Sequence, residues 1–67
     1  MENKFGNNLK QIRIKRKMTQ ADVAKVLNVS RSTYTYYETG KCEPNLKTIK
    51  KLAVIFKISI NYLFKDV

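Results

Sequence analysis

The chain has 67 residues, with 14 Lys and Arg against 5 Asp and Glu, a formal net charge of +9, one Cys and no His. This length predicts one small domain spanning residues 1–67 and leaves little room for a water-excluding catalytic cleft. A lone Cys without His excludes a Cys/His zinc site and an internal disulfide, and it fits a reducing, cytoplasmic setting. The longest apolar run, residues 52–56, is far shorter than the roughly 20 residues of a membrane span, and we expect no signal peptide.

The first predicted helix covers about residues 5–17. Its apolar residues Phe5, Leu9 and Ile12 follow a spacing of i, i+4 and i+7, which places them on one helical face. Arg13 stands directly beside this stripe, whereas the lysines of the segment lie mostly off it. The helix is therefore expected to turn one apolar face inward and to carry Arg13 at the edge of that face.

A second helix is predicted to begin after Thr19. The Thr19 side chain can cap the helix, and Asp22 three residues later provides a short form of the capping box. The expected inner face consists of Val23, Val26 and Leu27. The helix is expected to stop near residue 27, because Asn28 tolerates the left-handed conformation that a tight turn needs.

A third helix is predicted between Ser30 and Gly40. Ser30 is another N-cap, and Gly40 suits the left-handed position just past a helix end. The β-branched and aromatic content of residues 32–37 favours a strand by propensity alone, but the caps on both sides outweigh it. The residues expected to face the same core as the second helix are Val29, Tyr34 and Tyr37.

Two more helices are predicted after Pro44. Asn45 is the expected cap of the fourth helix, whose apolar residues recur at helical spacing: Leu46, Ile49, Leu52, Ala53 and Phe56. Ser59 is the expected cap of a short fifth helix. The sequence thus predicts an all-α fold of five helices without strands.

The second and third predicted helices meet the physical requirements of a helix–turn–helix. Their connecting turn is short, and the small side chain of Ala24 allows the two helices to cross closely. The face that the third helix leaves outside the core has side chains that can hydrogen-bond or stack, without an acid: Arg31, Ser32, Thr35, Tyr36 and Thr39. Such a helix fits the major groove of B-DNA, and the surplus of positive charge favours a nucleic-acid partner.

The chain resembles Cro/CI-type helix–turn–helix regulators of the Xre family over about residues 9–64. The resemblance depends on the joint order and spacing of short segments: 9–13 (LKQIR), 18–24 (MTQADVA), 30–34 (SRSTY), 37–41 (YETGK), Pro44, Leu46 and 58–63 (ISINYL). Asn28 stands where the family shares a Gly, and Tyr34 where it mostly has a smaller aliphatic residue. The resemblance implies a compact five-helix, lambda-repressor-like DNA-binding domain that regulates transcription, more often as a repressor than as an activator.

Several residues are expected to contact double-stranded DNA. The resemblance implies that Gln20 anchors to the backbone, and its place at a helix N-terminus, where free N–H groups and the helix dipole attract phosphate, agrees. Arg31 can fork onto the O6 and N7 atoms of guanine or bind a phosphate instead. The other expected contacts, to bases, sugars or phosphates, are Ser30, Ser32, Thr35, Tyr36, Thr39 and Lys41.

Two further sets of residues have expected structural roles. The resemblance implies that Arg13 and Glu38 meet as a partly buried ion pair tying the first helix to the third; the alternative is two unrelated surface charges. Because one helix contacts only a few base pairs, we expect a homodimer on a two-fold operator with half-sites about 34 Å apart. The expected dimer contact is apolar and close to the C-terminus: Ile55, Ile60, Tyr62 and Phe64. Alternatively, Ile60 and Phe64 only cover the core.

Other functions stay open at this point. A protein-interaction module, such as an antitoxin or anti-repressor, binds one protein tightly at high salt, whereas DNA binding weakens as salt rises. RNA binding requires Tyr34 and Tyr37 to leave the core and stack on bases. An enzyme is least expected, because the acidic residues are scattered and His is absent. We expect no cofactor, metal, membrane or small-molecule partner, and an incidental rather than redox-active Cys42.

Overall fold

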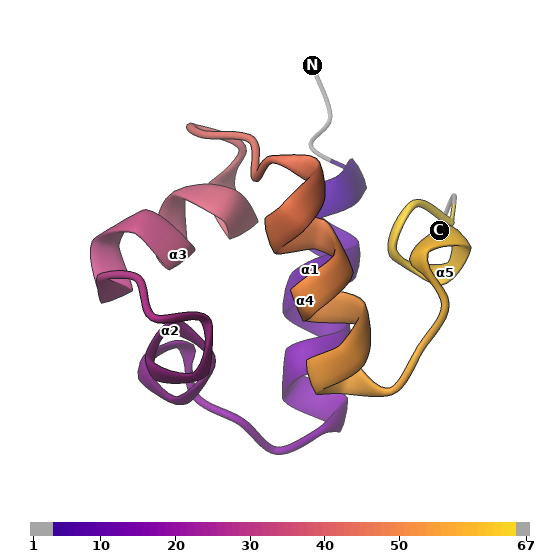
Figure 1. The fold of residues 1–67 in the computed structure, drawn as a ribbon, viewed down its shortest axis with the longest axis horizontal. Coiled ribbons are helices and arrows are strands. Elements are labelled where there is room, and N and C mark those ends of the chain that lie inside the picture. Colours follow the sequence, from indigo (N-terminus) through magenta and orange to yellow (C-terminus); the bar gives the residue numbers. More distant parts are fainter. Residues whose placement is uncertain (1–3, 66–67) are drawn as a thin grey trace.

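The computed structural model describes residues 4–65, and in this range the chain is helical without a strand. Five helices follow one another in this part of the chain: α1 (Lys4–Lys15), α2 (Gln20–Leu27), α3 (Arg31–Thr39), α4 (Leu46–Phe56) and α5 (Ile60–Leu63). α3 packs on α1 and α2, α4 on α2 and α5, and α5 on α1 (Figure 1). The predicted all-α class is confirmed. None of the described helices has the length and apolar character that crossing a membrane requires.

Side-chain caps define where the helices begin, as the sequence predicts. The Thr19 hydroxyl accepts the backbone N–H of Asp22 at 3.0 Å, and the Asp22 carboxylate accepts the backbone N–H of Thr19 at 2.9 Å, which completes the capping box. The next three helices each begin behind a capping side chain: Ser30, Asn45 and Ser59. The left-handed positions after α2 and α3 are Asn28, with φ of 61°, and Gly40, with φ of 82°. The predicted caps are thus confirmed.

The core draws on every helix. Its largest fully buried side chains are Leu9, Val23, Tyr34, Leu52, Phe56 and Leu63. Two predicted core positions are wrong, because Val26 is 60% exposed and Leu46 is 61% exposed. The buried side of α2 ends in Leu27, and at about 100° per residue Val26 projects from a neighbouring side of the helix. Leu46 is the first residue of α4, ahead of the buried residues, which begin at Leu52.

The short helix α5 is fastened to α1 by a buried polar side chain. Asn8 is 5% exposed, and its Nδ2 donates to the carbonyl oxygen of Leu63 at 3.2 Å and to that of Lys65. The ring centroids of Phe5 and Phe64 lie 5.0 Å apart. α5 has a single turn, and one turn is only marginally stable by itself. The hydrogen bonds from Asn8 therefore hold α5 in place against α1.

Candidate nucleic-acid interface

α3 has one side that is buried in the core and another that is exposed. Its buried residues are Tyr34, Tyr37 and Glu38. Four of the predicted DNA contacts on α3 are exposed: Arg31, Ser32, Tyr36 and Thr39. Because Tyr34 and Tyr37 pack edge to face inside the core, with ring centroids 6.3 Å apart, these two rings are not available to stack on bases. The RNA-binding alternative that needs them exposed is therefore contradicted.

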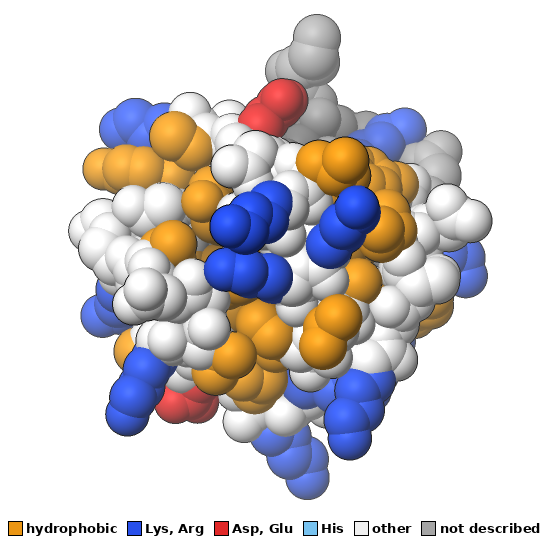
Figure 2. All heavy atoms as spheres, viewed as in Figure 1, with side chains coloured by type: hydrophobic (Ala, Val, Ile, Leu, Met, Phe, Trp, Pro, Cys, Tyr) orange, Lys and Arg blue, Asp and Glu red, His pale blue; other side chains and the backbone are white. Residues whose placement is uncertain are grey.

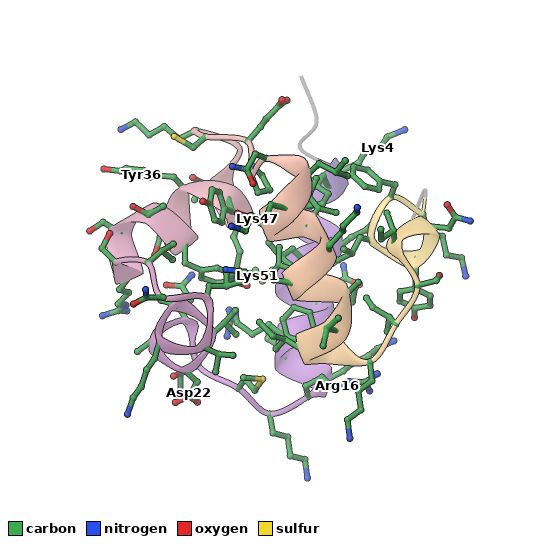
Figure 3. The ribbon with its side chains drawn as sticks, viewed as in Figure 1. Lys4, Arg16, Asp22, Tyr36, Lys47 and Lys51 are labelled. Atoms are coloured by element: carbon green, nitrogen blue, oxygen red, sulfur yellow. The ribbon has the colours of Figure 1, made fainter. Side chains whose placement is uncertain are left out.

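The first residue of α2 lies beside the exposed side of α3. Five of the predicted contact residues line one surface hollow, which we call the reading face: Gln20, Arg31, Ser32, Thr35 and Tyr36. Tyr36 extends outward from α3, away from the rest of the bundle (Figure 3). Among the described residues, no acidic side chain lines this hollow. The crossing of α2 and α3 thus gathers polar and basic groups that are separated in the sequence.

Three predicted contact residues lie outside the reading face. Lys41 is exposed just past α3, and its Nζ lies 5.1 Å from the centroid of the Tyr36 ring, a cation–π distance. Thr39 ends α3, and its hydroxyl donates to the Tyr36 carbonyl oxygen at 3.4 Å. The Ser30 hydroxyl accepts the N–H of Thr33 at 3.1 Å as the cap of α3. These three residues are tied to α3 by local bonds.

Gln20 is oriented by two neighbouring side chains. Its Nε2 donates to Glu38 Oε1 at 3.1 Å, and its Oε1 lies 3.1 Å from the hydroxyl oxygen of Thr35. Thr35 has one hydroxyl hydrogen, and the carbonyl oxygen of Arg31, 2.9 Å away, competes for it. The protein therefore sets the direction of the Gln20 amide before any ligand arrives.

An ion pair lies beneath the reading face. Arg13 Nε is 2.6 Å from Glu38 Oε2, and Arg13 Nη2 is 3.3 Å from Glu38 Oε1, so the guanidinium faces both carboxylate oxygens. The Arg13 and Glu38 side chains are 12% and 3% exposed. Arg13 Nη1 also donates to the carbonyl oxygen of Met18 at 2.9 Å. The structure brings these two residues together, and the pair joins α1 to α3.

The sequence pointed to Arg13 and Glu38 as a pair, but two further members of this cluster, Gln20 and Tyr34, were missed. We call the whole cluster the Glu38 network: Arg13, Gln20, Tyr34 and Glu38. The Tyr34 hydroxyl donates to Glu38 Oε2 at 2.5 Å. Burial raises the pKa of Tyr34 far above its ordinary value, and the bond to Glu38 raises it further. Burial also raises the pKa of Glu38, but the hydrogen bonds that it accepts, first from Arg13, hold this pKa below its usual value. The i, i+4 spacing of Tyr34 and Glu38 was the available signal.

The four residues expected to form a dimer contact differ in exposure. Tyr62 and Phe64 are 41% and 55% exposed, whereas Ile55 and Ile60 are half-buried and pack against the core. The open apolar surface at this end of the bundle therefore comes mainly from Tyr62 and Phe64.

The described part of the chain offers few side chains that could hold a metal ion or a cofactor. Within residues 4–65, no three His, Cys, Asp or Glu side chains gather to hold a metal ion. Cys42 is an exposed free thiol in the segment between α3 and α4. Polar groups do gather in the reading face and in the Glu38 network below it.

The sequence is similar to those of known regulators. It is 41% identical over 61 residues to the HTH-type transcriptional regulator YqaE of Bacillus subtilis, covering 91% of this chain and 53% of YqaE. It is 34% identical over 62 residues to the cryptic phage CTXphi transcriptional repressor RstR of Vibrio cholerae, covering 92% of this chain and 56% of RstR. The chain thus spans about half the length of these curated relatives.

The fold and a family model point the same way. The crystal structure of the restriction-modification controller protein C.AhdI from Aeromonas hydrophila is similar with a TM-score of 0.85 and 31% identity, over 91% of this chain and 92% of that one. The helix-turn-helix family model matches residues 9–63. This match includes α2, α3, the reading face and the whole Glu38 network. The chain therefore belongs to the helix–turn–helix family of Cro/CI (Xre) type.

Proposed function

We propose that this chain binds double-stranded DNA at specific sequences, with α3 in the major groove. The observation that carries the proposal is the reading face, which joins the start of α2 to an exposed side of α3 and, as far as the structure describes the chain, has no acidic side chain in its lining. A major groove about 12 Å wide admits one α-helix. Membership of the helix–turn–helix family supports the same function.

Within this proposal, base contacts and backbone contacts divide between different residues. Arg31 stands in the first turn of α3 and reads guanine through O6 and N7, while Ser32 and Thr35 touch base edges or thymine methyl groups. Gln20 opens α2 and anchors a phosphate at that helix N-terminus. The residues assigned to the DNA backbone are Ser30, Tyr36, Thr39 and Lys41.

The proposal includes a homodimer on a two-fold operator. A dimer doubles the sequence that is read, with half-sites about 34 Å apart. Tyr62 and Phe64 offer the open apolar surface for this contact, and Ile55 and Ile60 extend it toward the core. We further propose that DNA binding represses transcription, since one relative carries the name of a transcriptional repressor. The proposed location is the cytoplasm.

Selection of bound sequences from a pool of random duplexes tests the proposal. The expected result is a two-fold symmetric consensus whose affinity falls steeply as salt rises. Failure to enrich any sequence would count against specific DNA binding, and an asymmetric consensus would count against the dimer. Tight, salt-resistant binding to one protein without a DNA preference would favour the protein-interaction module instead.

Sedimentation at micromolar concentration tests the dimer contact separately. A Tyr62→Ser variant should shift the chain toward monomer, because Tyr62 is 41% exposed and its ring, unlike that of Phe64, does not stack on Phe5 of α1. A strict monomer in the unchanged chain, both alone and on a selected duplex, would remove the dimer from the proposal.

A further inference from the structure

A groove between α2 and α4 has no part in the proposed DNA contact. Its lining includes Val26 of α2 and five residues of α4: Lys47, Lys50, Lys51, Val54 and Ile55. Lys47 and Lys51 extend from α4 toward α2 and α3 (Figure 3). The residues of the reading face line a different hollow. We call this second hollow the α2–α4 groove.

The apolar floor of the α2–α4 groove consists of side chains that are not all needed in the core. Val26 is 60% exposed and Val54 is 76% exposed, and Ile55 beside them is half-buried. Scattered exposed valines are ordinary on protein surfaces, and the apolar patch here is small, but Val26, Val54 and Ile55 all line one shallow hollow. The space-filling view shows apolar and basic side chains side by side over α4 (Figure 2). The exposed valines therefore form a shared surface.

Lysines form the rim of the α2–α4 groove. Lys47, Lys50 and Lys51 follow a spacing of i, i+3 and i+4, so they project from neighbouring positions on α4. Among the described residues, none of the three takes part in an ion pair, and no acidic side chain lines the groove. Like charges at this spacing repel one another, so a negatively charged partner relieves that repulsion as well as gaining its own attraction.

We propose that the α2–α4 groove binds an acidic amphipathic helix of another protein. The apolar face of that helix packs on Val26 and Val54, and its flanking Asp or Glu residues pair with the lysine rim. A second copy of this chain is a poor occupant of this groove, because its 5 acidic residues are scattered along the sequence and offer no acidic helical face to the lysine rim. Duplex DNA satisfies the lysines but leaves most of the valine surface without a partner, since the backbone meets a protein mainly through charged phosphates.

Binding of a designed peptide to the 67-residue chain tests this inference. The probe is a labelled peptide of about four helical turns, with Leu at helical spacing and Glu on both flanks. A scrambled peptide of the same composition is its control. In two-dimensional NMR, the expected shifts concentrate at Val26, Val54 and Ile55, and the affinity measured by anisotropy falls as salt rises.

Three variants sharpen the test. Val54→Ser and Lys50→Glu should each weaken the peptide by about tenfold, because each removes a contact that is desolvated only in the complex. Lys15→Glu is the matched charge control, since Lys15 is exposed on α1 and lines a different hollow. It should change the peptide affinity less than about twofold, as expected for a distant screened charge. Binding is compared only among variants whose melting curves match that of the unchanged protein.

Defined results overturn the inference. Equal binding of the scrambled peptide, or equal weakening by Lys15→Glu and Lys50→Glu, means attraction to the basic surface at large. Loss of self-association in Val54→Ser means that a second copy covers the groove. If Lys50→Glu lowers the affinity for a selected duplex far more than Lys15→Glu does, the groove binds nucleic acid. Shifts confined to α3 place the peptide on the reading face.

Discussion

The reading face and the α2–α4 groove share α2, yet the protein supports them differently. Beneath the reading face lies the Glu38 network, in which Gln20 is hydrogen-bonded to a buried carboxylate. Beneath the groove lies the apolar core, with Leu27 and Leu52 buried. Hydrogen bonds are directional and costly to leave unmade, whereas apolar contacts have no preferred direction. The reading face should therefore respond to changes in the chemistry buried below it, and the groove mainly to changes in its own side chains.

The largest expected effect comes from removing the centre of the Glu38 network. Glu38→Ala leaves the Arg13 guanidinium and the Tyr34 hydroxyl without their shared acceptor. Breaking a buried pair in this way lowers the free energy of unfolding by about 3–5 kcal/mol. Urea denaturation followed by circular dichroism measures the loss, and Glu38→Gln, which keeps an acceptor, provides a milder variant if Glu38→Ala does not fold.

A double-mutant cycle decides whether the pair acts as a unit. Arg13→Ala and Glu38→Ala should show a coupling energy well above zero, because each removes the same interaction. Val54→Ser, in the groove, should change the free energy of unfolding by less than about 0.5 kcal/mol. Strict additivity of the two alanine variants would show that Arg13 and Glu38 do not act together to support the reading face.

A somewhat smaller effect is expected for base reading by Arg31. Arg31→Ala should cost about 1–3 kcal/mol of binding to the selected duplex and relax the preference at one position in each half-site. The free energy of unfolding should hardly change, because Arg31 is exposed. Electrophoretic mobility shifts against the full set of single-base operator variants give the answer. An unchanged preference at every position would assign Arg31 to a phosphate.

Acid should weaken the reading-face support before it affects the groove. Because the folded pKa of Glu38 lies below its ordinary value, the unfolded chain binds more protons in the interval between the two values. The stabilising contribution is thus complete above the unfolded pKa of about 4.3 and is lost as pH falls through the folded pKa. Denaturation curves at a series of pH values should show a steep acid loss in the unchanged chain and a flatter one in Glu38→Gln.

Asp22 is the control for this pH experiment. The hydrogen bond from the Thr19 backbone lowers the pKa of Asp22, so Asp22 adds a loss of stability with the same sign. Asp22→Asn should remove only the part of the acid-induced loss of stability that comes from Asp22, and the part that comes from Glu38 should remain. If Glu38→Gln titrates like the unchanged chain while Asp22→Asn does not, acid acts through the cap of α2 and the Glu38 network is not the sensitive element.

The starts of α2 to α5, the ends of α2 and α3, and the residues of the reading face were predictable from sequence, because their signals are local. The first helix ends at Lys15 rather than near residue 17, and the left-handed residues Lys17 and Lys57 carry no such signal. Thr19 and Ser30 each bond the N–H of a residue three positions ahead, so a short window contains both partners. The placement of Arg31 and Tyr36 outside the core follows from the caps and the helical period. What these side chains bind stays a prediction, since folding constrains only where they lie.

The exposed valines and the Glu38 network were harder to predict. Helical spacing groups Val26 with Leu27 as apolar neighbours but does not say which of them finds another helix to pack on. The bond from Gln20 to Glu38 joins residues 18 positions apart, and it exists only after α2 and α3 have crossed. Tertiary arrangement, which a single sequence does not encode in any short window, decides both features.

The smallest expected effect distinguishes two exposed lysines. Lys41 lies against Tyr36 at the edge of the reading face, whereas Lys50 stands on the rim of the α2–α4 groove. If Lys41 neutralises one phosphate, Lys41→Ala reduces the slope of log affinity against log salt by about 0.9 and weakens all duplexes alike. Lys50→Ala should keep the slope of the unchanged chain. Anisotropy titrations of a selected and a random duplex at several salt concentrations measure both slopes, and equal reductions in the two variants would show that DNA covers both surfaces.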